Sequence, residues 1–170
     1  MSIRIERVDA SFSLANQPFE IRGRLAVTFD GAWHWREELT GRSEMTFPDE
    51  PIPEGSLALA AFEGEQCLGL AVLRDDFFRY MYLHDLKVNR DCRGKGVGRR
   101  LIEAAVAAAK ERGYRGIRTI CQDNNLDACL FYLACGFVIG GLDTMGYRGT
   151  PQEGKKDIRF YLDLPGEEAK

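Results

Sequence analysis

The sequence is poor in the features that build metal centres and membrane spans. It contains two histidines, His34 and His84, and no two of its five cysteines form a C-x-x-C pair, so little is available for a zinc site. Its longest apolar runs, LALAAF and AAVAAA, fall far short of the roughly 20 residues that a membrane helix needs. The first segment, MSIRIERVDA, lacks the apolar stretch of a signal peptide. We therefore expect a cytoplasmic protein without a metal, whose thiols are reduced and mostly buried.

The charge balance and the missing phosphate motifs argue against further classes. The 23 Lys and Arg against 26 Asp and Glu give a net charge of −3, which predicts no general attraction to nucleic acid or to anionic membranes. The Walker pattern G-x-x-x-x-G-K-[ST] is absent, so we expect no nucleoside triphosphatase. The dinucleotide pattern G-x-G-x-x-G also fails, because Arg99 stands where its last glycine would be.

The patterning that is present predicts one mixed α/β domain over residues 1–170. Strands are expected at 2–8, on both sides of a turn at 63–65, at 79–88, in GIRTIC, in FVIGGL and in KDIRFYLDL. Helices are expected from about 97 to 112, in NNLDACLFYLACG and, as a short one, in AWHWREELT, whereas MTFPDEPIPEG reads as a loop. We expect one strand–glycine loop–helix–strand crossover near the middle of the sheet.

The segment RDCRGKGVGRRL, residues 90–101, places three glycines and five basic side chains at the mouth of a good helix. A helix N-terminus carries about +0.5 of an elementary charge and N–H groups without helical partners. Glycines let an anion approach these groups closely, and Arg93, Lys95, Arg99 and Arg100 add positive charge. The segment therefore predicts a phosphate or pyrophosphate site, although a purely structural turn and a solvated helix face are the alternatives.

The pattern [RQ]-x-x-G-x-[GA], here Arg93, Gly96 and Gly98, follows a strand and resembles the acetyl-CoA-binding motif of the GNAT N-acetyltransferase superfamily. The segment NNLDACLFYLACGF resembles the next helix of that superfamily. The runs PFEIRGR, RYMYLHDLKV, CRGKGVG and CQDNNLDACLFYLACGFVIGGLDTMGY are similar to the streptothricin acetyltransferase branch. The sequence departs from that branch at His84 and Ile120, where glutamates are usual, and in the acidic loop 44–54.

This resemblance implies the GNAT acyl-CoA N-acyltransferase fold, a central twisted, mostly antiparallel sheet with a parallel splayed pair, flanked by helices. It also implies acetyl-CoA as co-substrate, no metal, a small-molecule amine as acceptor and a possible homodimer. The positions that match cofactor contacts in the superfamily are Leu86, Lys87, Val88, Arg93, Gly94, Lys95, Gly96, Val97, Gly98, Arg99, Asn124, Asn125, Ala128 and Tyr132. For Asn124 and Asn125, simple helix capping is the alternative.

Acetyl transfer to an amine needs a base, because an alkylamine with a pKa near ~10.4 is charged at neutral pH. We expect His84 to be this base, with Asp85 as second candidate, and Tyr132 to donate a proton to the departing sulfur. The structural alternatives are a packed or cofactor-adjacent histidine, a strand salt bridge of Asp85 and a core aromatic at Tyr132.

Acidic and aromatic residues suggest a small cationic substrate, which agrees with the β-lysine group of streptothricin. The candidates to hold or wall it are Asp143, Tyr80 and Tyr82, followed by Asp76, Asp123, Trp33, Trp35 and Tyr147. Two other functions stay open. The acceptor could be a protein N-terminus, a lysine or a polyamine, or the chain could be a non-catalytic CoA-binding module, against which the presence of both His84 and Tyr132 argues.

Overall fold

The computed structural model describes residues 2–166 of the chain, which form two compact units. The first unit contains residues 2–18, 46–118 and 163–166, and the second contains residues 19–45 and 119–162. Across the described residues, every helix is too short or too polar to cross a membrane.

The first unit is built on a sheet whose strands run in the order β1-β4-β5-β6-β7. Its members are β1 (Arg4–Val8), β4 (Leu57–Glu63), β5 (Gln66–Arg74), β6 (Tyr80–Val88) and the first three residues of β7 (Gly116–Gln122). Neighbouring strands are antiparallel except for β6 and β7, which pair in parallel. This confirms the expected mixed, mostly antiparallel sheet with one parallel pair.

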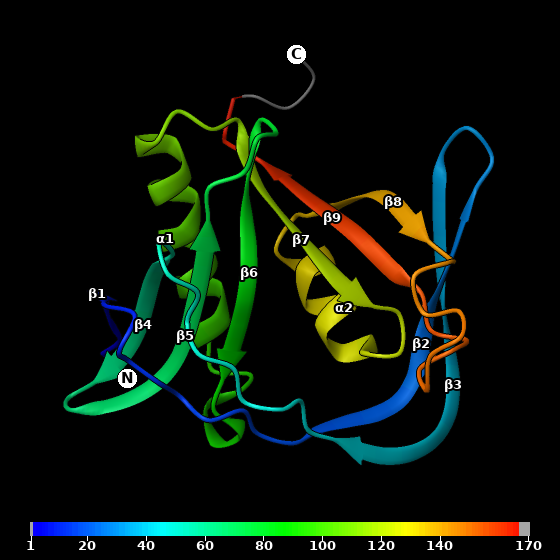
Figure 1. Ribbon diagram of the computed structural model, residues 1–170, viewed down its shortest axis with the longest axis horizontal. Coiled ribbons are helices and arrows are strands. Elements are labelled where there is room, and N and C mark those ends of the chain that lie inside the picture. The colour runs from blue at the N-terminus through cyan, green and yellow to red at the C-terminus, as the bar shows by residue number, and fades with distance from the viewer. Residues whose placement is uncertain (1, 167–170) are drawn as a thin grey trace. The chain divides into compact units, whose positions relative to one another are not determined.

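Helix α1 (Val97–Glu111) packs against β4, β5 and β6 (Figure 1), and its crossover between β6 and β7 is the one predicted from the sequence. Close approach of the helix depends on Gly69 in β5. A Cβ added there would lie 2.7 Å from the backbone oxygen of Lys87 and 3.1 Å from the Cδ1 of Leu101. A separate apolar cluster joins β4 and β5 to the N-terminal segment; it contains Ile52, Ala58, Ala60, Leu70 and Val72, with Val8, Phe12 and Leu14 packed against it.

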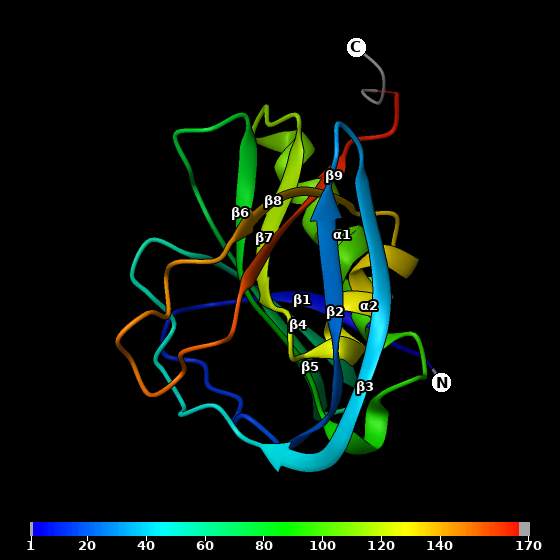
Figure 2. The same ribbon diagram turned by 90° about the vertical axis from the view of Figure 1, so that its right-hand side faces the viewer.

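The second unit contains a two-stranded hairpin, β2 (Phe19–Phe29) and β3 (Trp33–Met45), which Figure 2 shows in blue and cyan. The predicted short helix in AWHWREELT (residues 32–40) is wrong, because residues 33–40 belong to strand β3. Cross-strand contacts explain the outcome: Arg24 pairs with Glu38 at 3.2 Å, and the rings of Phe29 and Trp33 lie 4.6 Å apart.

The rest of the second unit comprises the end of β7, helix α2 (Leu126–Ala134) and the antiparallel pair β8 (Val138–Asp143) and β9 (Asp157–Asp163). Asn125 caps α2 by accepting a hydrogen bond from the N–H of Ala128 at 3.4 Å. Helix capping was the structural alternative to a cofactor contact for this residue. The last residue of β9 belongs to the first unit.

Candidate active site

The second half of β6 has a strand on one edge only. Strand β5 pairs along β6 from Tyr82 to Val88, whereas the pairing with β7 covers Tyr80–Tyr82. Within residues 2–166, no further strand pairs with residues 84–88, which include the predicted cofactor residues Leu86, Lys87 and Val88. Such an edge presents backbone N–H and C=O groups to which an extended ligand can add like a strand.

His84 lies at an irregularity in this strand. Asp85 pairs with Val72 and Leu83 pairs with Leu73, so the register shifts and His84 has no partner residue on β5. A bulge of this kind re-aims a side chain and is common beside active sites. The half-buried imidazole meets the ring of Tyr82 edge to face, with centroids 6.0 Å apart and an interplanar angle of 90°.

The neighbouring Asp85 has the strand ion pair that was the alternative to a catalytic role. Its Oδ2 lies 3.6 Å from the Nζ of Lys87, and this ammonium also donates to the Oδ1 of Asn16 at 3.2 Å. The carboxylate is 41% exposed. Of the two candidate bases, Asp85 therefore has an ion-pair partner two residues further along the same strand.

The glycine loop leaves room for an anion. Gly94 and Gly96 have φ angles of 75° and 86°, in the left-handed region, and a Cβ added at either would meet no other atom within 4 Å. Gly96 is the N-cap of α1 and no side chain of residues 2–166 caps the helix start. The first-turn N–H groups therefore lie beside open space. Lys95 and Arg99 are exposed at this loop, Val97 is buried and Gly98 is partly buried.

Arg93 shapes the loop as well as charging it. Its Nε donates to the oxygen of Val88 at 3.0 Å, and its NH1 donates to the oxygen of Pro18 at 3.0 Å. Partial burial, with the nearby charge of Arg90, lowers the pKa of the guanidinium from its usual value. The sequence predicted the charge of Arg93 but not these two backbone contacts.

The second unit holds the remaining predicted cofactor positions around α2. Asn125 and the N–H of Ala128 are joined in the helix cap, whereas the Oδ1 of Asn124 is buried and has no hydrogen-bond partner in the described part of the chain. Tyr132 is 8% exposed. Its ring contacts those of Phe137 and Phe160, with centroids 5.2 and 5.6 Å away. Tyr132 thus has the core packing that was its structural alternative, and this packing also fixes its ring.

Two predicted substrate residues have structural partners. The hydroxyl of Tyr80 donates to Asp163, and burial, followed by this carboxylate, raises the pKa of Tyr80. The Oδ1 of Asp143 accepts the N–H groups of Met145 and Gly146 at 2.8 and 3.0 Å, which lowers the pKa of Asp143. These bonds give Asp143 a loop-capping role.

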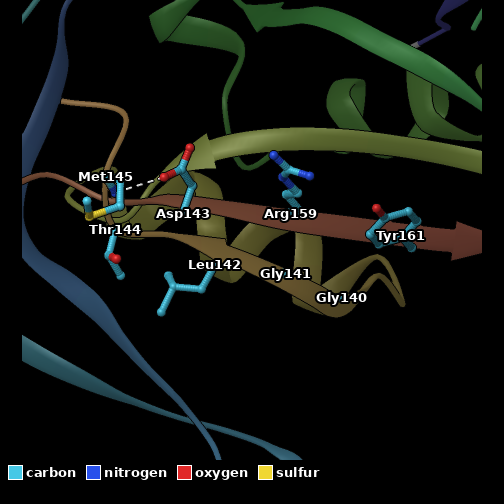
Figure 3. A pocket seen from close by; sticks show the side chains of 8 residues that line it. All are labelled: Gly140, Gly141, Leu142, Asp143, Thr144, Met145, Arg159 and Tyr161. Carbon is cyan, nitrogen blue, oxygen red and sulfur yellow. Dashed lines mark hydrogen bonds between the residues drawn. The ribbon is translucent and has the colours of Figure 1, made fainter.

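Asp143 also lines a pocket of about 360 Å³ in the second unit. Figure 3 shows Arg159 and Tyr161 along β9, with Arg159 next to Asp143 and Tyr161 beyond it, and Gly140 and Gly141 along β8. A Cβ at Gly140 would lie 2.5 Å from the Tyr161 ring, so glycine lets this ring lie against the strand.

Two further substrate candidates, Tyr147 and Asp123, form hydrogen bonds within the second unit. Tyr147 donates to the Oδ1 of Asp157 at 2.7 Å and accepts from Gln122 at 2.9 Å. Burial, followed by the hydrogen bond to Asp157, raises the pKa of Tyr147 to about 12. Asp123 is buried and its Oδ1 accepts the N–H of Lys156 at 3.0 Å. Trp35 is 46% exposed on the hairpin.

Comparison with known proteins settles the family. A sequence model described as the acetyltransferase (GNAT) family matches residues 25–137. Streptothricin acetyltransferase A of Bacillus subtilis (strain 168) is 32% identical over 158 residues, which cover 88% of this chain and 91% of that protein. The chain is a GNAT acetyltransferase. The predicted family, fold class and enzyme class are therefore confirmed.

Two further comparisons extend this similarity. A streptothricin acetyltransferase of Escherichia coli is 32% identical to this GNAT acetyltransferase over 118 residues, covering 69% of this chain and 68% of that one. Among solved structures, a candidate streptothricin acetyltransferase from Bacillus anthracis str. Ames, in complex with acetyl coenzyme A, has a TM-score of 0.86 at 29% identity. That similarity covers 96% of this chain and 99% of the other.

Proposed function

We propose that this GNAT acetyltransferase transfers the acetyl group of acetyl-CoA to a primary amine of a streptothricin-type antibiotic and so confers resistance to it. The observation that carries the proposal is the similarity to a streptothricin acetyltransferase over 158 residues, which reaches well beyond the 113 residues matched by the general family model (137 − 25 + 1). We further propose that residues 1–170 act as a single GNAT domain.

The residues of the first unit fit acetyl-CoA on two observations. The left-handed Gly94 and Gly96 border open space at the uncapped start of α1, which suits the diphosphate of the cofactor. The edge of β6 at Leu86–Val88 suits the amide-containing pantetheine arm. In the second unit, the buried and unpartnered Oδ1 of Asn124 is an acceptor that fits an amide donor of the same arm.

The acetyl donor supplies an activated thioester, and the chain supplies proton transfer and orientation. In the proposal, His84 accepts the proton that the attacking amine loses, and Asp85 is the second candidate for this role. Tyr132 donates a proton to the departing sulfur. Backbone N–H groups of β6 offer hydrogen bonds to the acetyl oxygen. A positioned base contributes about 10²- to 10⁴-fold to the rate, and the missing cross-strand partner of His84 supports its assignment, because bulges often present functional side chains.

A thiol-release assay with acetyl-CoA and a panel of amines tests the acceptor. The panel contains streptothricin, a peptide with a free N-terminus, a lysine peptide with a blocked N-terminus and a polyamine. We expect streptothricin to be acetylated with the highest kcat/KM. A higher kcat/KM for a peptide or for the polyamine would show that this amine, and not the antibiotic, is the acceptor. Binding of acetyl-CoA without thiol release on any amine would support a non-catalytic module instead.

A further inference from the structure

Arg118 of β7 forms a nearly buried ion pair with the loop between β5 and β6. Its Nε donates to the Oδ2 of Asp76 at 2.8 Å, and its NH2 donates to the same oxygen. The two side chains are 15% and 8% exposed. The other oxygen of Asp76 accepts the N–H of Phe77 at 2.8 Å, so both carboxylate oxygens are engaged. A desolvated pair with this many hydrogen bonds is held in one geometry.

The guanidinium of Arg118 also lies over two aromatic rings of the first unit. Its Cζ is 4.7 Å from the centroid of Tyr82 and 5.5 Å from that of Phe78. Both distances are within the range of cation–π attraction. The guanidinium of Arg118 therefore covers one face of the Tyr82 ring, so this face is already occupied by a cation of the protein and not open to a substrate ammonium.

The loop that carries Asp76 is held by hydrogen bonds to Tyr114 and Arg112. The N–H of Asp76 donates to the hydroxyl of Tyr114 at 3.1 Å, and this hydroxyl donates to Asp75 at 2.9 Å. Arg112, at the end of α1, contacts both carboxylate oxygens of Asp75 at 3.1 and 3.0 Å. Asp76 is thus held through its backbone as well as its side chain. Because Arg118 is hydrogen-bonded to this carboxylate, its guanidinium is held in place too.

The contacts continue from Tyr82 to His84. The two rings meet edge to face at 6.0 Å, and His84 has no partner residue on β5 that could set its direction. The only aromatic contact that the structure records for the imidazole among the described residues is Tyr82. A bulged residue whose ring rests on one neighbour takes its orientation from that neighbour.

We propose that Arg118 is a positioning residue that orients the imidazole of His84 by holding the ring of Tyr82. The proposal rests on the proposed function, in which His84 is the base. It assigns a role to three groups from three elements: Asp76 fixes Arg118, Arg118 fixes Tyr82, and Tyr82 sets the direction in which His84 faces the amine. Arg118 itself touches neither substrate nor reacting atoms in this account.

The presence of two histidines in the sequence allows a direct test by NMR of the imidazole signals. His34 lies on β3 of the second unit, where it contacts Asp30 at 2.9 Å, and serves as an internal reference. Assignment comes from His34→Gln. We expect Arg118→Lys, which keeps the charge but loses the planar fork, to move the ring signals of His84 and to leave those of His34 in place. Unmoved His84 signals would overturn the proposal.

Arg115→Lys is the matched control. Arg115 contacts Asp163 at 3.4 Å, and Asp163 accepts from the hydroxyl of Tyr80, so this arginine takes part in a similar Arg–Asp–Tyr arrangement. The recorded contacts of that arrangement do not include His84. We expect Arg115→Lys to leave the His84 signals unchanged. Should Arg118→Lys fail to fold, Tyr82→Leu keeps the buried ion pair, removes the linking ring and is expected to move the same signals.

Kinetics of a double-mutant cycle separate this inference from the function on which it rests. We expect Arg118→Lys to lower kcat about 10- to 100-fold, the scale of a misplaced catalytic group, with an unchanged KM for acetyl-CoA. In a His84→Ala background the same substitution is expected to cost less than about 2-fold, because the group it orients is gone. Equal losses in both backgrounds would overturn the role of Arg118. Wild-type turnover by His84→Ala alone would instead overturn the base assignment.

Discussion

Substituting Gly96 by alanine separates the binding role of the glycine loop from its cost in stability. Gly96 is the N-cap of α1 and Gly113 lies two residues after its last residue, Glu111; their φ angles are 86° and 80°, and a Cβ added at either meets nothing within 4 Å. Alanine in a left-handed conformation costs about 1–2 kcal/mol. Because the backbone and the surroundings are alike, Gly96→Ala and Gly113→Ala are expected to lower the free energy of unfolding by similar amounts.

Their effects on cofactor binding are expected to differ. Only Gly96 borders the uncapped N–H groups at the start of α1. Loss of one hydrogen bond to a charged phosphate oxygen costs about 1.5–3 kcal/mol. At about 1.4 kcal/mol per tenfold, this predicts that Gly96→Ala weakens CoA binding about 10- to 100-fold. Calorimetric titration with CoA and urea unfolding of both variants measure the two effects. Equal Kd values for the two variants would refute the reasoning.

Three further predictions follow from single contacts. Gly69→Ala places a Cβ 2.7 Å from the Lys87 oxygen and is expected to lower the free energy of unfolding in urea by about 1–3 kcal/mol; a wild-type midpoint would contradict it. His84→Ala is expected to lower kcat about 10²- to 10⁴-fold in the thiol-release assay while the Kd for CoA stays unchanged, and a parallel loss of both would argue against a base. The pKa of Tyr147 is raised to about 12 in the folded protein, whereas it is near 10 in the unfolded chain. The folded state therefore binds more protons between these values, and the free energy of unfolding falls as pH rises from about 10 to 12. Tyr147→Phe is expected to flatten this part of the pH profile of the unfolding midpoint, and an unchanged slope would exclude Tyr147 as its source.

Local signals in the sequence were enough for the crossover and its glycine loop. The helix after Gly96 has strong helix formers and a glycine stop at Gly113, and both ends lie where the pattern puts them. Both strands of the hairpin in the second unit were missed, although Asp30-Gly31 is a strong turn signal and Gly31 has a φ of 105°. The segment AWHWREELT was expected to be a short helix, but in the fold two of its glutamates pair with arginines across the two strands.

The parts of the site that were not predicted depend on contacts between distant segments. The register shift at His84 is set by how β6 pairs with β5, which residue spacing within β6 does not reveal. The partners of Arg118 come from the loop at Asp76 and from Tyr82, more than 30 residues earlier in the chain (118 − 82 = 36). The loop-capping bonds of Asp143, a predicted residue for cation binding, likewise depend on a local backbone geometry that the sequence did not reveal.

The most direct test of the central claim is mass spectrometry of both antibiotic and protein after one turnover with acetyl-CoA. We predict that streptothricin gains one acetyl group on an amine of its β-lysine part, that one CoA thiol appears for each acetyl transferred, and that the protein stays unmodified. Release of the thiol with the antibiotic unchanged would contradict the account.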